Sequence, residues 1–509
     1  MKLQQSLLAA ASAIALTAPL AAEAASVKNT ILLVSDGASW GTWDMASYWQ
    51  HGEKGRQTYD GFDVKLGMTT LPLNTSNTPT NSNTPEVSYE PGKAWDATPV
   101  DNGEKFAGYD YIKQGATDSA AAATALSTGK ATYNNAIAYD NFGRPLPSIT
   151  DKLKDQGKAV GVVSSVPLSH ATPAGFAAEN ISRNNYGEIS REMIQSGNMN
   201  LVMGGGHPFY DSNGQLKTEG AFANETGTGG GYIAKSVWDD VTGDAASMQL
   251  IQERADFEAL ADGSKTVDGP LLGVFKSGDT LQQARSEDVF GADAADAANA
   301  SGIAYNQDVP TLETMTKGAL NHLGRDEDGF FVMIEGGAVD WAAHANQTDR
   351  IIEEQVDFNK SVTAAYDWVN ANSNWDETLL IVLTDHGNGM PMGPNSDTIA
   401  FEGIQNNGAG NLPGVQWHHG THTRENTLLW AHGAGSDLFS DAILGSDPDF
   451  ARLIGHTPTG DYIANTSVHD VIAAANGVEA PAPVPVPLPI ALLGGGLALL
   501  GGLKLRRKG

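Results

Sequence analysis

The segment FFVMIEGGAVDWAAH, from Phe330 to His344, indicates a buried strand followed by a helix. Its first five residues are all apolar, which favours a strand that is covered on both faces of a sheet. Asp340 and His344 are four residues apart, so on a helix they share one face and can hold one metal ion. Glu335 ends the strand and could reach a second metal. An exposed helical pair would have the same spacing, and the spacing alone does not choose between the two.

Outward from this segment, further short apolar runs indicate buried strands, at residues 30–35, 158–164, 200–203, 378–384 and 427–431. Helical patterns separate them, for example at residues 119–126 and 347–370. This alternation predicts an α/β fold, a three-layer α/β/α sandwich with a central, mostly parallel sheet. Residues 73–101 are rich in Asn, Thr, Pro and Ser and are typical of a loop. Residues 204–310 have weak periodicity, and we expect an insertion there.

Charged side chains follow two of the predicted strands directly. Asp36 comes after the first strand, and Asp385 and His386 come after the strand at residues 378–384. Ligands of open α/β sheets bind beyond the carboxyl ends of the strands, so these side chains are expected to meet at one site. Adjacent Asp and His side chains can bind one cation. Both segments could instead be ordinary turns, since Asp and Gly are frequent turn residues.

A serine stands at the predicted start of the helix at residues 119–126. Ser119 follows Thr117 and Asp118 and precedes four alanines, which favour a helix. Free backbone N–H groups and the helix dipole favour an anion at this position. Ser119 could serve as a nucleophile there, activated by a metal. The alternative is a simple Asp-Ser helix cap.

Two further segments carry imidazoles. One holds His418, His419 and His422, and clustered histidines in an exported protein often bind metal. The spacing does not choose among the three. The other is His170-Ala-Thr172-Pro173, followed eleven residues after Thr172 by Arg183. A guanidinium binds phosphate with two parallel hydrogen bonds, although an arginine seen without context can equally be a surface residue.

Composition narrows the classes of partner. The 509 residues carry 60 acidic and 31 basic side chains, a formal net charge of −29, and no cysteine. Nucleic acid is not expected as a partner, because phosphate backbones bind to basic patches. An anionic substrate would need locally concentrated positive charge, such as bound metal ions. Without thiolates, any metal would be held by His and carboxylate ligands.

The two ends of the chain have the features of export and sorting segments. Lys2, an apolar run and Ala22-Glu-Ala24 predict a signal peptide at residues 1–24, although a buried N-terminal helix is the alternative. A catalytic domain is expected at residues 25–479, then a Pro-rich linker at 480–489 and a hydrophobic tail at 490–509 that ends in Arg-Arg-Lys-Gly. The tail resembles the Val-Pro-Leu-Pro type of sorting signal of Gram-negative exosortase-like systems. A permanent membrane anchor is the alternative.

Taken in order, four motifs resemble the metal-dependent alkaline phosphatase family over residues 28–435. They are Thr-Asp-Ser-Ala at 117–120, His-Ala-Thr-Pro at 170–173, Glu-Gly-x3-Asp-x3-His from 335, and Thr-Asp-His-Gly at 384–387. The resemblance implies a phosphatase that forms a phosphoserine at Ser119, with Arg183 binding the phosphate. It also implies two zinc ions and one magnesium ion, in three neighbouring metal sites.

By this resemblance, each metal site has its own ligands. The first zinc would be held by Asp340, His344 and His422, with His419 as the second choice for the last ligand. The second zinc would be held by Asp36, Asp385 and His386. The magnesium would be held by Thr172 and Glu335, with Asp36 bridging to it.

Two positions depart from the enterobacterial form of the family. His170 stands where that form has Asp, and Trp341 stands where it has Lys; both would contact the substrate. An imidazole at the third site can favour zinc or cobalt over magnesium. Trp341 also removes a cation near the phosphate.

The predicted function is therefore hydrolysis of small phosphate monoesters, for phosphate scavenging. A periplasmic, surface or extracellular location in a Gram-negative bacterium is expected, with the tail contacting the inner membrane and the sorting machinery, and a homodimer is possible by family analogy. The alternatives are a phosphodiesterase, sulfatase or phosphonate hydrolase of the same superfamily, and a non-catalytic surface protein that binds metal or phosphate. The sulfatase Cys/Ser-x-Pro-x-Arg motif is absent from the sequence.

Overall fold

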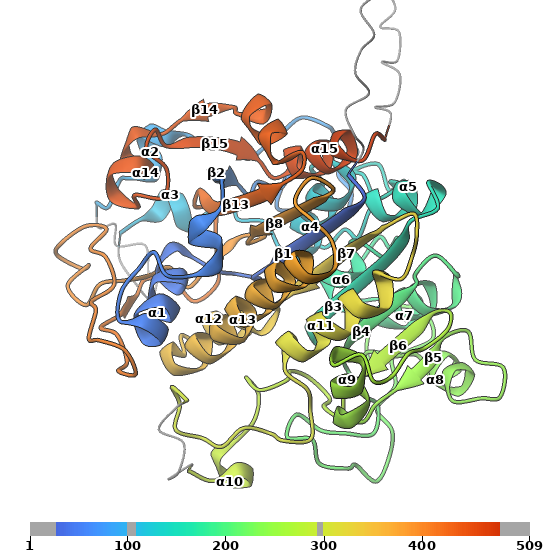
Figure 1. The fold of residues 1–509 in the computed structure, drawn as a ribbon. Coiled ribbons are helices and arrows are strands. Elements are labelled where there is room, and N and C mark those ends of the chain that lie inside the picture. The colour runs from blue at the N-terminus through green and yellow to red at the C-terminus, as the bar shows by residue number, and fades with distance from the viewer. Residues whose placement is uncertain (1–26, 99–107, 293–298, 479–509) are drawn as a thin grey trace, which may run out of the picture. The chain divides into compact units, whose positions relative to one another are not determined.

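A computed structural model describes residues 27–98, 108–292 and 299–478. Among these residues, eleven strands form one sheet in the order β14-β15-β2-β13-β8-β1-β7-β3-β4-β6-β5 (Figure 1). From edge to edge the strands are β14 (Gly445–Ser446), β15 (Asp461–Ala464), β2 (Val64–Thr69), β13 (Thr427–Gly433), β8 (Thr378–Leu383), β1 (Asn29–Val34), β7 (Phe330–Glu335), β3 (Ala159–Pro167), β4 (Leu201–Gly205), β6 (Leu271–Val274) and β5 (Gln249–Ile251). The seven strands from β8 to β5 are mutually parallel, whereas β13 runs antiparallel to both of its neighbours.

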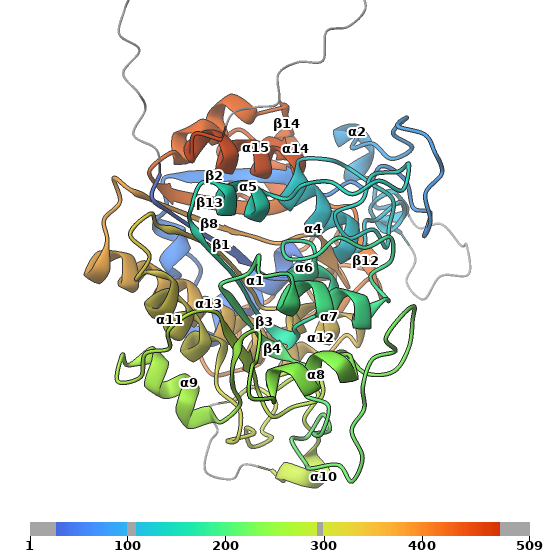
Figure 2. The ribbon, with the colours of Figure 1, turned by 90° about the vertical axis from the view of Figure 1, so that its right-hand side faces the viewer.

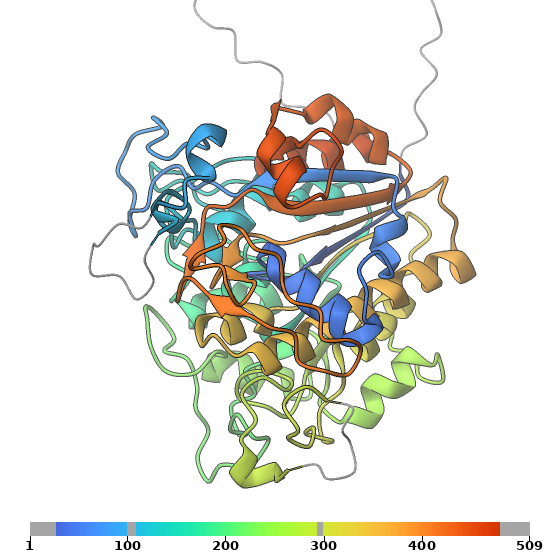
Figure 3. The ribbon, with the colours of Figure 1, turned by 90° about the vertical axis from the view of Figure 1, so that its left-hand side faces the viewer.

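Helices cover both faces of this sheet, as views from two opposite sides show (Figure 2; Figure 3). One layer consists of α1 (Trp40–His51), α9 (Arg254–Ala261), α11 (Leu312–Leu323), α12 (Ala338–His344) and α13 (Thr348–Asn372). The other consists of α4 (Ser119–Thr128), α5 (Ile149–Asp155), α6 (Ala171–Ala174), α7 (Tyr186–Gln195), α8 (Lys235–Val241) and α15 (Thr466–Ala475). The remaining helices are short: α2 (Pro91–Ala94), α3 (Asp110–Lys113), α10 (Glu287–Phe290) and α14 (Pro448–Leu453).

The pleat of β1 explains why its last four residues, 31–34, are all apolar. Ile31 and Leu33 belong to the hydrophobic core under α1 and α13, while Leu32 and Val34 belong to the core under α4 and α15. Successive side chains of a strand point to opposite faces, so a central strand needs apolar residues at every position. The predicted three-layer α/β fold is therefore confirmed.

The six strands expected from apolar runs are all present, within a few residues of the expected bounds. The other five strands of the sheet, β2, β5, β6, β14 and β15, lie toward its two edges and were not predicted. Two of them, β5 and β6, lie inside the stretch 204–310 that we expect to be an insertion, and they extend the parallel part of the sheet.

Two pairs of two-residue strands lie beyond the carboxyl end of β8. The strands β9 (Gly387–Asn388) and β12 (His422–Thr423) pair antiparallel, and so do β10 (Pro391–Met392) and β11 (Gln416–Trp417). The first pair sets His422 opposite Asn388 and so brings the histidine-rich segment to the end of the sheet.

The predicted signal peptide, the Pro-rich linker and the hydrophobic tail lie outside the described residues. Within the described part of the chain, no helix has the length and apolar character needed to cross a membrane.

Candidate active site

The carboxyl ends of three adjacent parallel strands carry acidic side chains. Asp36 lies two residues beyond β1, Glu335 is the last residue of β7, and Asp385 lies two residues beyond β8. Because β1 pairs with both β7 and β8, the three carboxylates meet at one edge of the sheet. This is the position that the sequence predicts for a ligand site.

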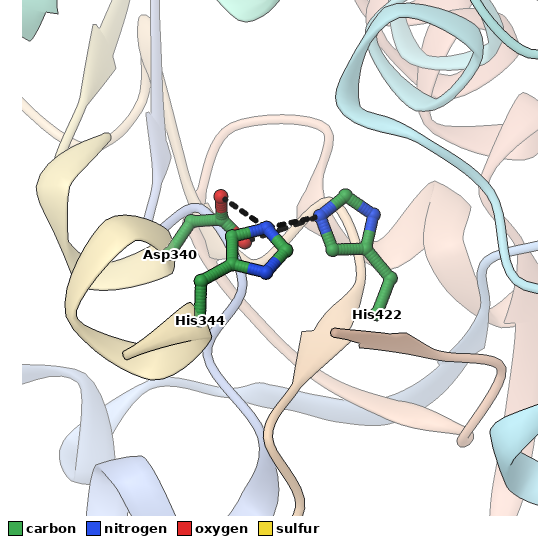
Figure 4. Close-up of side chains that lie close together, drawn as sticks. All are labelled: Asp340, His344 and His422. Carbon is green, nitrogen blue, oxygen red and sulfur yellow. Dashed lines mark hydrogen bonds and ion pairs between the residues drawn. The ribbon is translucent and has the colours of Figure 1, made fainter. Parts of the chain in front are cut away.

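The first ligand cluster is formed by Asp340, His344 and His422 (Figure 4). His344 Nε2 lies 3.3 Å from one carboxylate oxygen of Asp340, and His422 Nε2 lies 3.3 Å from the other. The two imidazole Nε2 atoms are 3.2 Å apart. Burial alone would raise the pKa of Asp340, but the neighbouring His422 and His344 hold that pKa well below its usual value. Three donor atoms therefore converge on one point, as metal coordination requires.

The second ligand cluster is formed by Asp36, Asp385 and His386, all of them buried. His386 Nε2 lies 3.4 Å from Asp36 Oδ1 and 3.2 Å from Asp385 Oδ2. Neither of these carboxylate oxygens has a hydrogen-bond partner in the structure. Burial, followed by the negative charge of Asp385, raises the pKa of Asp36 well above its usual value. Buried carboxylates in this state are costly unless a cation neutralises them.

A third group of oxygens adjoins the second cluster. Thr172 Oγ1, from α6, donates a hydrogen bond of 3.3 Å to Asp36 Oδ2. Glu335 accepts a hydrogen bond from Ser164 through Oε2, whereas its Oε1 is buried without a partner. Burial raises the pKa of Glu335 to about 7. Hard oxygen donors of this kind suit magnesium.

Ser119 is the first residue of α4, and Asp118 is its cap. The Asp118 carboxylate accepts the backbone N–H of Ala121 at 2.9 Å, so the capping role falls to Asp118. The Ser119 hydroxyl lies 3.1 Å from His386 Nε2 instead. It thus combines two features expected of a nucleophile, namely a helix N-terminus and contact with a ligand cluster.

A cavity of about 620 Å³ opens over Ser119 and the first cluster. Arg183 lines it and forms an ion pair of 3.0 Å with Asp118. His170 and Trp341 line it as well, with their rings 5.6 Å apart in an edge-to-face arrangement. The site residues expected from the sequence are therefore gathered around one cavity or directly beneath it.

The structure separates the three clustered histidines. His422 lies in the first cluster, while His418 contacts the Ser396 hydroxyl at 2.7 Å and packs against Tyr109. Neither His418 nor His419 belongs to a metal-ligand group among the described residues. The choice follows from the pairing of β12 with β9, which the spacing of histidines does not reveal.

Sequence reasoning missed three residues of the site. Asn388 Nδ2 donates a hydrogen bond of 2.6 Å to Asp340 Oδ1, and so orients a member of the first cluster. Lys113 and Asn134 line the cavity. No motif singles these residues out, because each reaches the site through the packing of a loop or a short element.

The family model described as Alkaline phosphatase matches residues 27–413 of the chain. Alkaline phosphatase 3 of Bacillus subtilis is 31% identical over 302 residues, which are 58% of this chain and 53% of that protein. The alkaline phosphatase of Escherichia coli is 32% identical over 295 residues, which are 54% of this chain and 58% of that protein. The chain thus spans about half the length of the curated relatives it matches.

A solved structure has a similar fold. The cold-active alkaline phosphatase from a psychrophilic Shewanella species has a TM-score of 0.59 and 21% sequence identity. The similarity covers 89% of this chain and 100% of that one.

Proposed function

Because the chain belongs to the alkaline phosphatase family, we propose that it hydrolyses phosphate monoesters through a phosphoserine at Ser119. The observation that carries this proposal is the position of the Ser119 hydroxyl. It lies at the N-terminus of α4, 3.1 Å from His386 Nε2, in a cavity that Arg183 also lines.

The donor atoms fit the metal ions that the family resemblance implies. The first cluster offers one carboxylate and two imidazoles, and the second offers two carboxylates and one imidazole; both sets suit zinc. The oxygens of Glu335, Thr172 and Asp36 suit magnesium. The unpartnered oxygens of Asp36, Asp385 and Glu335 support this fit, since buried acceptors rarely stay unsatisfied. We propose zinc at the first and second clusters and magnesium at the third, where zinc or cobalt could replace it. When bound, these ions neutralise the buried carboxylates and supply Lewis-acid stabilisation of the transition state.

The protein's own groups account for binding and orientation. The guanidinium of Arg183, held by Asp118, can donate two hydrogen bonds to non-bridging phosphate oxygens. The N-terminus of α4 favours the same dianion. Ser119 Oγ then attacks phosphorus in line: its bond to phosphorus forms as the bond to the leaving oxygen breaks, and the alcohol leaves with the serine proton. Water attacks the phosphoserine in the second step, which releases phosphate and restores the hydroxyl.

We also propose export from the cell and small phosphate monoesters as substrates. Residues 1–24 have the layout of a signal peptide, and residues 480–509 that of a sorting tail. A periplasmic, surface or extracellular enzyme of this kind would scavenge phosphate. A homodimer remains part of the proposal by family analogy.

Hydrolysis of p-nitrophenyl phosphate by the full chain at alkaline pH tests the proposal. Ser119→Ala is expected to lower kcat/KM by at least about 10³-fold, as loss of a nucleophile does in other hydrolases. The matched control is Ser127→Ala, a buried serine at the other end of the same helix. Chelation should abolish activity, and zinc with magnesium should restore it.

Full activity of Ser119→Ala would contradict the proposed nucleophile. A metal-loaded wild type that cleaves bis(p-nitrophenyl) phosphate but not the monoester would identify a phosphodiesterase. A wild type inactive on both, with phosphate still bound, would favour the non-catalytic surface protein.

A further inference from the structure

We propose that Lys113 is a specificity-determining residue, which favours substrates whose leaving group carries a negative charge of its own. Nucleoside diphosphates and triphosphates, inorganic pyrophosphate and phosphorylated carboxylic acids belong to this class. The inference rests on the proposed phosphatase function and extends it from the phosphate to the other half of the substrate.

Lys113 is a buried cation in the wall of the active-site cavity. It is the last residue of α3 (Asp110–Lys113), it is only 8% exposed, and it lines the same cavity as Ser119 and Arg183. Lysine is rarely buried to this extent. It belongs to neither ligand cluster and lies outside the motifs that carry the family resemblance.

The packing of α3 sets Lys113 in the same cavity wall as His422. The backbone N–H of Arg424 donates a hydrogen bond of 2.8 Å to the carbonyl of Ile112, which ties α3 to the chain just after β12. His422, in β12, has its Nδ1 2.9 Å from the carbonyl of Thr117. Lys113 is therefore close to the segment that carries the last ligand of the first cluster.

Arg183 lies next to different neighbours. It is held by Asp118 at 3.0 Å, and its Nη2 is 3.4 Å from His170 Nε2. The cavity wall thus offers one guanidinium near the serine helix and one ammonium near β12. The first is the expected phosphate clamp, and the second is not among the residues that the family resemblance assigns to phosphate binding.

In-line displacement decides which half of the substrate faces Lys113. The leaving oxygen must lie roughly opposite the attacking oxygen across phosphorus. Ser119 contacts His386, a member of the second cluster, so the leaving oxygen points toward the first cluster of Asp340, His344 and His422. The remainder of the leaving group then occupies the part of the cavity that Lys113 and Thr421 line.

The size of the cavity allows such a leaving group. Its volume of about 620 Å³ lies within the range of sites that take whole organic ligands. The chain as a whole carries a formal charge of −29, which repels anionic substrates. A partly dehydrated ammonium in the wall offsets that repulsion locally, because charges interact more strongly away from bulk water.

The positive charge of Lys113 acts on its surroundings in the structure. Burial, opposed by the charge of Asp397 and assisted by that of Lys113, lowers the pKa of His418 to about 4. His418 lies close to the first cluster in sequence, four residues before His422. Lys113 is therefore close enough to His418 for its charge to act on that imidazole.

A pair of substrates that differ only in leaving-group charge tests this inference. We would measure kcat/KM for 4-carboxyphenyl phosphate and for its methyl ester, 4-(methoxycarbonyl)phenyl phosphate, with the zinc- and magnesium-loaded full chain. The specificity ratio is the value for the acid divided by the value for the ester. Lys113→Met should lower this ratio roughly fivefold to tenfold, as expected for a charge pair at intermediate dielectric. Lys113→Glu should lower it further, and Lys113→Arg should retain it.

The control is Lys130→Met, which makes the same charge change at an exposed lysine just beyond the opposite end of α4 from Ser119. Its ratio should match that of the wild type. Raising the salt concentration should reduce the wild-type ratio and leave that of Lys113→Met nearly constant, because salt screens the lost interaction. Lys113→Gln, which also removes the charge but keeps a polar side chain, is measured alongside and replaces Lys113→Met if the methionine variant does not fold.

An unchanged ratio in both Lys113→Met and Lys113→Gln would overturn the inference. An equal loss of activity on both esters would also overturn it, because it would give Lys113 a structural role only. If the wild type hydrolyses neither ester, the proposed function fails and the inference falls with it.

Discussion

The two ligand clusters use the same kinds of side chain in opposite surroundings. In the second cluster, Asp36, Asp385 and His386 all follow central strands and have side chains that are at most 1% exposed. In the first cluster, Asp340 and His344 come from a helix, His422 comes from a two-residue strand, and the side chain of His344 is 39% exposed. One cluster is part of the core, and the other is assembled at the cavity wall.

This difference also appears in the acidity of the two clusters. The pKa of Asp36 is raised by burial and by neighbouring carboxylates, whereas the pKa of Asp340 is lowered by its two histidines. The charge of Asp36 therefore opposes folding in the absence of a cation, while the charge of Asp340 is already compensated by protein groups. We infer that the second cluster depends on its metal for electrostatic balance and that the first can exchange its metal more readily.

The largest expected effect follows a neutral substitution in the second cluster. Asp36→Asn preserves the shape of the side chain but removes a ligand charge shared by the second and third groups. Activity on p-nitrophenyl phosphate should fall by about 10³-fold, since metal ions contribute several kcal/mol to transition-state stabilisation. Excess zinc should not restore it. Activity within tenfold of wild type would remove Asp36 from the metal site.

A substitution in the first cluster should have a smaller and partly reversible effect. His344→Ala removes the most exposed ligand, and we expect a loss of about 10²-fold at low zinc, with part of it recovered at high zinc. Steady-state rates over a zinc titration measure this. If His344→Ala proves as severe and as irreversible as Asp36→Asn, the two clusters do not differ as we infer.

The support of the first cluster can be tested through Asn388. Its amide holds Asp340 Oδ1 at 2.6 Å, and outer partners of this kind are worth about 10-fold to 100-fold in metal affinity. Asn388→Ala should weaken zinc binding by that factor, measured by competition with a chromogenic chelator. Asn74→Ala, a buried amide outside the cavity, is the control and should leave zinc affinity unchanged. Equal affinities in all three proteins would leave Asn388 without this role.

The smallest expected effect is on the free energy of unfolding of the metal-free protein, and its sign differs between the two clusters. In the metal-free protein at pH 6, where the raised pKa of His344 keeps that imidazole protonated, Asp36→Asn should raise the free energy of unfolding by about 1 kcal/mol or more, because it removes an uncompensated buried carboxyl group. Asp340→Asn should lower it, because it removes a charge that His422 and His344 stabilise. Denaturant unfolding after chelation measures both. Changes of the same sign would contradict the contrast between the clusters.

The same contrast explains what could be predicted from the sequence. The ligands of the second cluster directly follow apolar strands, so the periodicity of the chain locates Asp36, Asp385 and His386 at the end of the sheet. Helical spacing places Asp340 and His344 on one face, and the family resemblance was needed to interpret them as ligands. His422 was predicted through the resemblance alone, because its place depends on the pairing of β12 with β9, two strands of two residues each.

The edge of the fold was harder to predict than its centre. The central strands β1, β7 and β8 are buried at every position, but β5 has an exposed and a half-buried residue, and β2 begins with two half-buried residues. Short edge strands lack a distinct apolar run and depend on neighbours that are distant in sequence. Lys113 could not be predicted as a residue of the site either, because a single lysine shortly before a glycine belongs to no motif.

The most direct test of the central claim is to trap the phosphorylated enzyme. The metal-loaded full chain would be mixed with a phosphate monoester, quenched in acid within one turnover, digested and analysed by tandem mass spectrometry. The account predicts phosphate on Ser119, absent after chelation and in Ser119→Ala, and present in Ser127→Ala. Rapid turnover of the ester with no phosphate on Ser119, or with phosphate on another residue, would contradict it.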